Sequence, residues 1–87
     1  MPRIEKEVMV KNSQGLHARP AALFVRIASQ YDSTITVTKE QETVNGKSIM
    51  GILMLGAEQH SKVTLVADGH DAEKAIAQLE EFLTQNE

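Results

Sequence analysis

The segment from Gly15 to Ala21 combines residue types that could hold and transfer an anion. It has the sequence Gly-Leu-His-Ala-Arg-Pro-Ala, and it lies where a loop passes into a helical pattern. The first turn of a helix has backbone N–H groups without helical partners, and the positive end of the helix dipole favours anions there. Arg19 adds a permanent charge whose geometry suits phosphate. A neutral imidazole at His17 is a nucleophile, so this segment could carry a phosphoryl group.

The same residues also fit a plain solvated helix end. Helix termini that could bind anions are common, and most of them carry no function. Pro20 suits the first helical turn in either case, because an N–H group is not needed there. Spacing alone therefore leaves both interpretations of His17 and Arg19 open.

A second segment, from Asn45 to Gly51, places a serine before a short apolar stretch. Ser48 is expected to cap a helix over residues 49–55, because serine is a preferred residue at that position. A phosphate on its hydroxyl would face the helix N-terminus, which favours negative charge. Capping alone would also explain a serine at this position, so the residue type does not decide between the two roles.

Two of the expected helices have more apolar residues than a single buried stripe requires. We expect one set to point into the core: Leu23, Phe24, Ile27, Ile52 and Leu55. We expect a second set to face outward and form a docking patch for protein partners: Ala22, Val25, Ile49, Met50 and Leu53. Methionine suits such a surface, because its flexible side chain adapts to several partners.

The elements that position these segments follow from hydrophobic periodicity. Alternating apolar residues predict strands over 4–10, 34–38, 43–44 and 63–67, and four-residue spacing predicts helices over 18–31, over 49–55 and after Asp71, which we expect to cap the last one. The order is β-α-β-β-α-β-α. Short connections favour an α+β open-faced two-layer sandwich, with a four-stranded antiparallel sheet and three helices on one face.

Length and composition exclude several classes of protein. The 87 residues predict one domain, 1–87, and the absence of cysteine excludes disulfides and thiolate metal sites. A net charge of −3 and 3% aromatic residues argue against a nucleic-acid partner. We expect a cytoplasmic chain without membrane insertion, because no stretch has a signal peptide's pattern or a spanning length. We place His60 and His70 in surface turns and expect no metal site and no cofactor.

The two segments, in this order and about thirty residues apart, resemble the histidine-containing phosphocarrier (HPr) family of the bacterial phosphoenolpyruvate:sugar phosphotransferase system. The resemblance extends from Val8 to Leu83, and the Gly15–Ala21 motif is highly specific to the family. Lys-Ser-Ile-Met-Gly at 47–51 is similar to its regulatory serine segment. Gly46 is a departure, because a larger residue often stands there, and we expect it to loosen the loop before Ser48.

The resemblance implies roles for individual residues. His17 would accept a phosphoryl group on Nδ1 from phosphorylated enzyme I and pass it to enzyme IIA, with Arg19 and the N–H groups of Ala18 and Arg19 binding the phosphoryl group. Ser48 would be the target of an ATP-dependent HPr kinase/phosphorylase, and its phosphorylated form could meet a transcriptional regulator. Arg26 and Lys47 would add positive charge to the docking patch.

Other functions fit parts of this sequence. A Crh-type regulatory module of the same fold keeps the serine and lacks the histidine, so His17 argues against it. The nitrogen-related branch keeps the histidine without this serine segment, so Lys-Ser-Ile-Met at 47–50 argues against it. A small metabolite-binding domain would need an enclosed pocket. Surplus apolar residues on two adjacent helices fit a flat docking surface better than such a pocket. A relay must expose its histidine, so we expect a monomer with short-lived interfaces.

Overall fold

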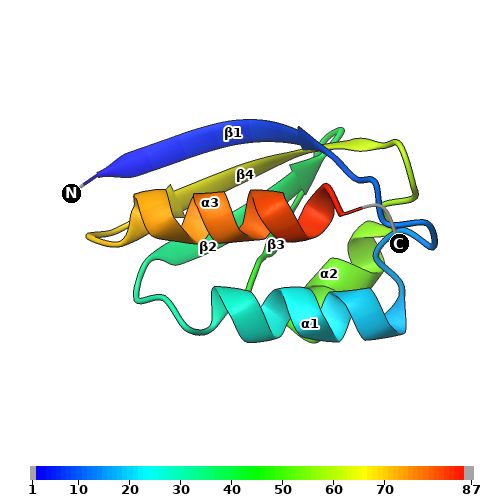
Figure 1. The fold of residues 1–87 in the computed structure, drawn as a ribbon, viewed down its shortest axis with the longest axis horizontal. Helices are drawn as coiled ribbons and strands as arrows, with labels where there is room; N and C mark the ends of the chain where they lie inside the picture. Colours follow the sequence, from blue (N-terminus) through cyan, green and yellow to red (C-terminus); the bar gives the residue numbers. More distant parts are fainter. Residues whose placement is uncertain (1, 86–87) are drawn as a thin grey trace.

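A four-stranded antiparallel sheet forms one layer of the computed structural model, which describes residues 2–85 (Figure 1). Its strands are β1 (Arg3–Met9), β2 (Thr34–Lys39), β3 (Glu42–Asn45) and β4 (Lys62–Asp68), and the helices are α1 (Ala18–Ala28), α2 (Ile49–Leu55) and α3 (Ala72–Leu83). The strand order is β1-β4-β2-β3. This arrangement confirms the predicted open-faced sandwich and its β-α-β-β-α-β-α order.

The helices cover a single face of the sheet (Figure 1). α3 packs on β1 and β4, α2 packs on β2 and β3, and α1 contacts both other helices. Along β4 the side chains alternate, so Val63, Leu65 and Ala67 are buried beneath the helices while Thr64 on the other face is only half-buried. Period-two alternation of this kind is typical of an antiparallel sheet with one solvated face. Among residues 2–85, none of the helices has both the length and the apolar character needed to cross a bilayer.

The buried stripe of α1 agrees with the expected one at Phe24 and differs from it at Leu23. Its buried residues are Ala21, Phe24 and Ala28, which follow the three- and four-residue spacing of one helical face. Leu23, expected in the core, is 41% exposed because it lies on the flank of that stripe. The helix also ends at Ala28, three residues before the predicted end.

The turn between β3 and α2 is closely packed rather than loose. Gly46 is buried and its N–H donates to the carbonyl of Ile35 at 2.7 Å. A Cβ atom added to Gly46 would lie 2.6 Å from Cγ2 of Ile35. The expectation of a loosened loop was therefore wrong, because glycine lets this turn approach β2 at a distance that no side chain would permit.

Asp71 stands at the start of α3, but its carboxylate does not bond to that helix. It accepts hydrogen bonds from the N–H groups of Asp32 (2.8 Å) and Ser33 (3.0 Å), and from the Ser33 hydroxyl. Asp71 therefore occupies the expected N-cap position, but its side chain bonds to the α1–β2 loop instead of to the helix. These bonds, led by the Ser33 hydroxyl, lower the pKa of Asp71 to about 2.

This lowered pKa predicts an acid-dependent contribution of Asp71 to stability. A carboxyl group whose pKa is lower in the folded state stabilises the fold above its ordinary pKa, and the stabilisation is lost as the pH falls towards 2. We expect Asp71→Asn to lower the free energy of unfolding at pH 7, and the difference from the parent to shrink between pH 4 and pH 2. Urea unfolding at several pH values measures this, with Asp68→Asn at the nearby end of β4 as the control. A difference that stays constant down to pH 2 would contradict this account.

Candidate functional site

The loop between β1 and α1 turns sharply so that His17 emerges at the surface. Gly15 has a φ of +67°, and an added Cβ would lie 2.6 Å from the carbonyl oxygen of Ala57. Leu16 is buried, and its N–H donates to that same oxygen at 2.8 Å. The next residue, His17, is exposed. Anchoring Leu16 in the core therefore fixes where the chain enters α1 and presents the imidazole to solvent.

His17 occupies the N-cap position of α1, with an extended backbone and no side-chain cap hydrogen bond. Its carbonyl accepts the N–H of Ala21 at 2.8 Å, the first bond of the helix. The N–H groups of Ala18 and Arg19 precede this bond and have no helical acceptor, and Pro20 has no N–H. Two backbone donors and one imidazole thus lie at the positive end of the helix, an arrangement that can bind an anion on the histidine.

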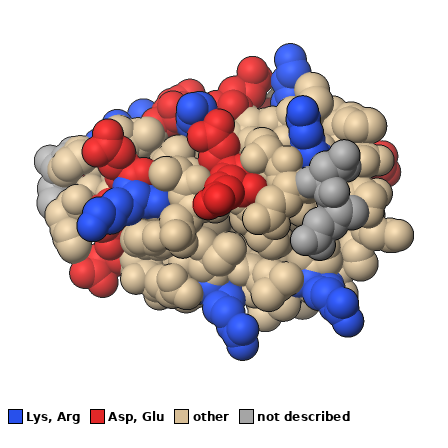
Figure 2. Space-filling model, viewed as in Figure 1, with Lys and Arg blue, Asp and Glu red and all other residues tan. Residues whose placement is uncertain are grey.

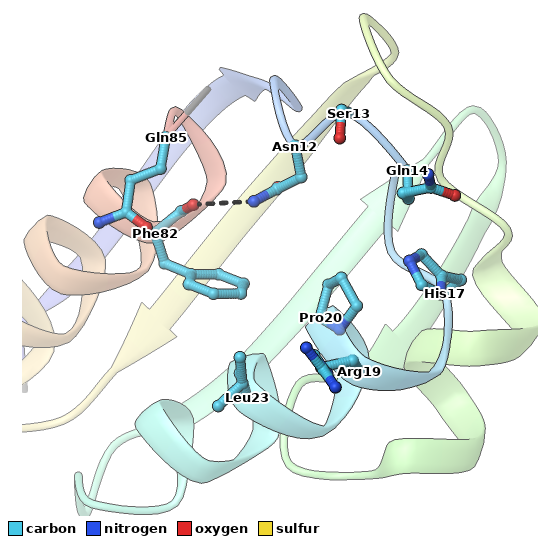
Figure 3. Close-up of a pocket in the computed structure, with 9 residues that line it drawn as sticks. All are labelled: Asn12, Ser13, Gln14, His17, Arg19, Pro20, Leu23, Phe82 and Gln85. Carbon is cyan, nitrogen blue, oxygen red and sulfur yellow. Dashed lines mark hydrogen bonds between the residues drawn. The ribbon is translucent and has the colours of Figure 1, made fainter. Parts of the chain in front are cut away.

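A hollow of about 560 Å³ opens beside His17 (Figure 3). The loop residues 12–14 form one wall, the first turns of α1 form another through Arg19, Pro20 and Leu23, and Phe82 and Gln85 close it at the end of α3. Among the lining residues in the described part of the chain, Arg19 is the only Lys, Arg, Asp or Glu. The sequence did not suggest Phe82 or Gln85, because only the fold brings the end of α3 to this loop.

Ser48 caps α2 as predicted. Its Oγ accepts the N–H of Gly51 at 3.0 Å, and the side chain remains half-buried. α2 follows directly and exposes Ile49, Met50 and Leu53. The serine therefore stands at the edge of an apolar surface.

Comparisons with known proteins identify the family. A family model described as "PTS HPr component phosphorylation site" matches residues 4–85. The chain belongs to the HPr family. It is 44% identical over 80 residues to the HPr-like protein Crh of Halalkalibacterium halodurans, which covers 92% of this chain and 95% of that protein.

Two solved structures of HPr-family proteins are also similar. The crystal structure of the phosphocarrier protein HPr from Bacillus anthracis has a TM-score of 0.92 and 41% identity, covering 95% of this chain and 99% of that one. The crystal structure of Crh from Bacillus subtilis has a TM-score of 0.77 and 37% identity, covering 95% of both chains, and it is described as a dimer with a swapped domain. The fold of this HPr-family chain therefore matches both a phosphocarrier and a Crh protein.

The predicted docking residues other than Lys47 lie on two helices that contact each other, α1 and α2. Ala22, Arg26, Ile49, Met50 and Leu53 are exposed, whereas Val25 is half-buried against the core. Met54, which the sequence analysis did not select, is 67% exposed beside them. We call the exposed apolar residues Ala22, Ile49, Met50, Leu53 and Met54 the α1–α2 patch. Figure 2 shows that the charged atoms visible over α1 belong to Lys or Arg.

Lys47, which we expected to add charge to the docking patch, forms a hydrogen bond within this HPr-family chain. Its Nζ donates to the carbonyl of Tyr31 at 2.6 Å, just beyond the end of α1, and the side chain is half-buried. The ammonium group thus has a partner within the protein and ties the α2 entry loop to α1. Its contribution to docking stays a prediction.

A group of titratable side chains joins the loop that follows α1 to the turn that precedes α3. Nε2 of His70 lies 3.0 Å from a carboxylate oxygen of Asp32, and ligand atoms of Asp32, His70 and Asp71 lie within 4.8 Å of one another. Sequence patterns did not predict these carboxylates beside His70, because two loops distant in sequence meet here. The absence of a metal site stays a prediction. The hydrogen bond to Asp32, with the charge of Asp71, raises the pKa of His70.

Substitution of Gly15 tests how tightly the His17 loop is constrained. Gly15→Ala combines a positive φ with a collision against backbone atoms of Ala57 and Glu58. We therefore expect it to lower the free energy of unfolding by more than about 1 kcal/mol. Gly56→Ala is the control, because Gly56 also has a positive φ but its nearest neighbouring atom is 4.0 Å away. Chemical denaturation of both variants measures the difference, and equal losses would show that the collision at Gly15 contributes nothing.

Proposed function

We propose that this HPr-family chain is a phosphocarrier that acts through His17. Nδ1 of the imidazole would attack the phosphorus atom of phosphorylated enzyme I, forming a P–N bond as the bond to enzyme I breaks. The same phosphoryl group would then pass to a histidine of a sugar-specific enzyme IIA. The observation that carries this proposal is the placement of an exposed histidine at the N-terminus of α1, within a chain that matches the family over residues 4–85.

The surroundings of His17 support phosphoryl binding. The first-turn N–H groups of Ala18 and Arg19 can donate to phosphoryl oxygens, and the Arg19 guanidinium adds a charge-assisted partner. Proximity of these groups to the reacting atom would stabilise the negative charge that moves between partners. In this proposal the chain carries the phosphoryl group and does not turn over substrate by itself.

The α1–α2 patch is the proposed docking surface for enzyme I, enzyme IIA and the kinase. It is apolar, and the charged residues of α1 are Arg19 and Arg26. A surface of this kind fits an acidic partner with an apolar centre, because charge complementarity speeds encounter while apolar contact holds the complex. Such relay interfaces are small and short-lived.

A regulatory function resembling that of Crh is the second candidate. The identity of 44% to a Crh protein and the presence of Ser48 favour it. His17 argues for the carrier, since the Crh type lacks the histidine. Phosphorylation of Ser48 by an ATP-dependent HPr kinase/phosphorylase is compatible with both functions, and a transcriptional regulator could read the phosphorylated form.

The proposal also covers the domain organisation, the location and the oligomeric state of the chain. The described elements share one sheet and one core, which supports a single domain over residues 1–87. A relay that starts from phosphoenolpyruvate would operate in the cytoplasm. The monomeric state stays a prediction, because the Crh structure from Bacillus subtilis is described as a dimer.

Intact-mass spectrometry tests the carrier function directly. After incubation with phosphoenolpyruvate and a bacterial enzyme I, we expect the parent chain to gain one phosphate that mild acid removes, because phosphoimidazole hydrolyses readily. His17→Ala should gain none, and His60→Ala is the matched control that should still be modified. Absence of the phosphate on the folded parent, with an enzyme I that modifies a known HPr, would favour the Crh-like function.

A negative charge at residue 48 tests the docking proposal. Ser48→Asp keeps a good N-cap residue, so the fold should be retained, but it adds negative charge at the edge of the α1–α2 patch. We expect affinity for enzyme I to fall about tenfold at low salt and the loss to shrink at high salt. Ser48→Asn is the neutral capping control. Calorimetric titration measures the affinities, and equal values for both variants at low salt would contradict an electrostatic effect.

A further inference from the structure

Asn12 is a buried polar side chain in the loop that leads to His17. It is 7% exposed, and its Nδ2 donates to the carbonyl of Phe82 at 3.3 Å (Figure 3). Its Oδ1 is buried and has no hydrogen-bond partner among the residues that the structure describes. A buried acceptor left unpaired lowers stability, because nothing compensates for the water it loses on folding. An amide at this position therefore needs an explanation other than stability.

The side chain of Asn12 bonds to the end of α3. The last carbonyls of a helix have no donors from the helix itself. The β1–α1 loop supplies two, because Asn12 Nδ2 donates to Phe82 and the N–H of Lys11 donates to the carbonyl of Leu83 at 2.7 Å. The loop thus caps α3, and the end of α3 in turn holds the loop.

The backbone of Asn12 begins the turn that carries the histidine. Its carbonyl accepts the N–H of Gly15 at 2.9 Å, and Leu16 is then anchored to Ala57. The side chain of Asn12 therefore fixes one end of a short segment whose other end is His17. Both residues line the hollow in Figure 3, as does Phe82.

We infer that Asn12 is a positioning residue for phosphoryl transfer through His17, acting by tying the 12–16 turn to the C-terminal end of α3. This inference rests on the proposed phosphocarrier function. It assigns Asn12 no contact with the phosphoryl group. A small displacement of a reacting group lowers a transfer rate steeply, so a tether that costs stability can still favour the reaction.

The test separates position from stability by replacing Asn12 with an apolar residue of similar size. Asn12→Leu removes the bond to Phe82 and also the unpaired acceptor, so we expect an unchanged or higher unfolding midpoint. We expect the rate of transfer from phosphorylated enzyme I to fall about tenfold while the affinity for enzyme I stays unchanged. The imidazole ¹H signals of His17 should shift in the unphosphorylated chain. A purely structural role would change rate and stability in the same direction.

Two further variants keep the inference falsifiable. Asn12→Ala removes the same hydrogen bond but leaves a void, so it should lose stability and still show the same loss of rate as Asn12→Leu. Thr84→Val removes bonds from the Thr84 hydroxyl to the carbonyls of Glu80 and Glu81 at the same end of α3, and it should transfer at the parent rate. Parent-like rates and unshifted His17 signals in both Asn12 variants would overturn the inference. A parent chain that accepts no phosphate would refute the carrier function instead, and the His17 signals would still report on the tether.

Discussion

The backbone hydrogen bond from Leu16 to Ala57 determines where His17 lies at the start of α1. Leu16 must be buried for the core to close beneath α1, yet the following residue must be exposed if its imidazole is to meet another protein. The chain can make this change only because Gly15 turns with a positive φ against the Ala57 and Glu58 backbone. The position of α1, its free N–H groups and the hollow beside it all follow from that turn.

Ser48 and His17 depend on different kinds of local chemistry. Ser48 uses its hydroxyl as a helix cap, bonded to Gly51, and is half-buried. His17 also occupies an N-cap position, but its side chain makes no cap bond. Among the residues that the structure describes, no hydrogen bond engages the imidazole. Such a ring would suit the proposed carrier function, because no bond of this kind has to break before a phosphoryl group is accepted. A phosphoserine is a stable ester, so it suits a signal that persists.

Much of the fold could be predicted from the sequence, because strong hydrophobic periodicity within a segment indicates whether it forms a strand or a helix. The α2 bounds were predicted correctly for this reason, and the Ser48 cap was predicted correctly because serine is preferred at that position. The inward face of α1 was partly wrong at Leu23, since two adjacent stripes of that helix are apolar and only packing selects one. Asn12, Phe82 and the Asp71–Ser33 contact were missed, because they depend on loops that meet across about 40 to 70 residues of chain. No short-range sequence pattern encodes contacts of this kind.

Positive and negative side chains are distributed unevenly between α1 and α3. The charged residues of α1 are arginines, whereas α3 carries Glu73, Glu80 and Glu81 with a single lysine. In Figure 2 the acidic atoms gather away from α1. Although the net charge is −3, this separation produces an electric dipole across the two helices. In the field of an acidic surface such a molecule experiences a torque that turns α1 towards that surface. It would therefore approach with His17 facing the surface, even while its net charge opposes the approach.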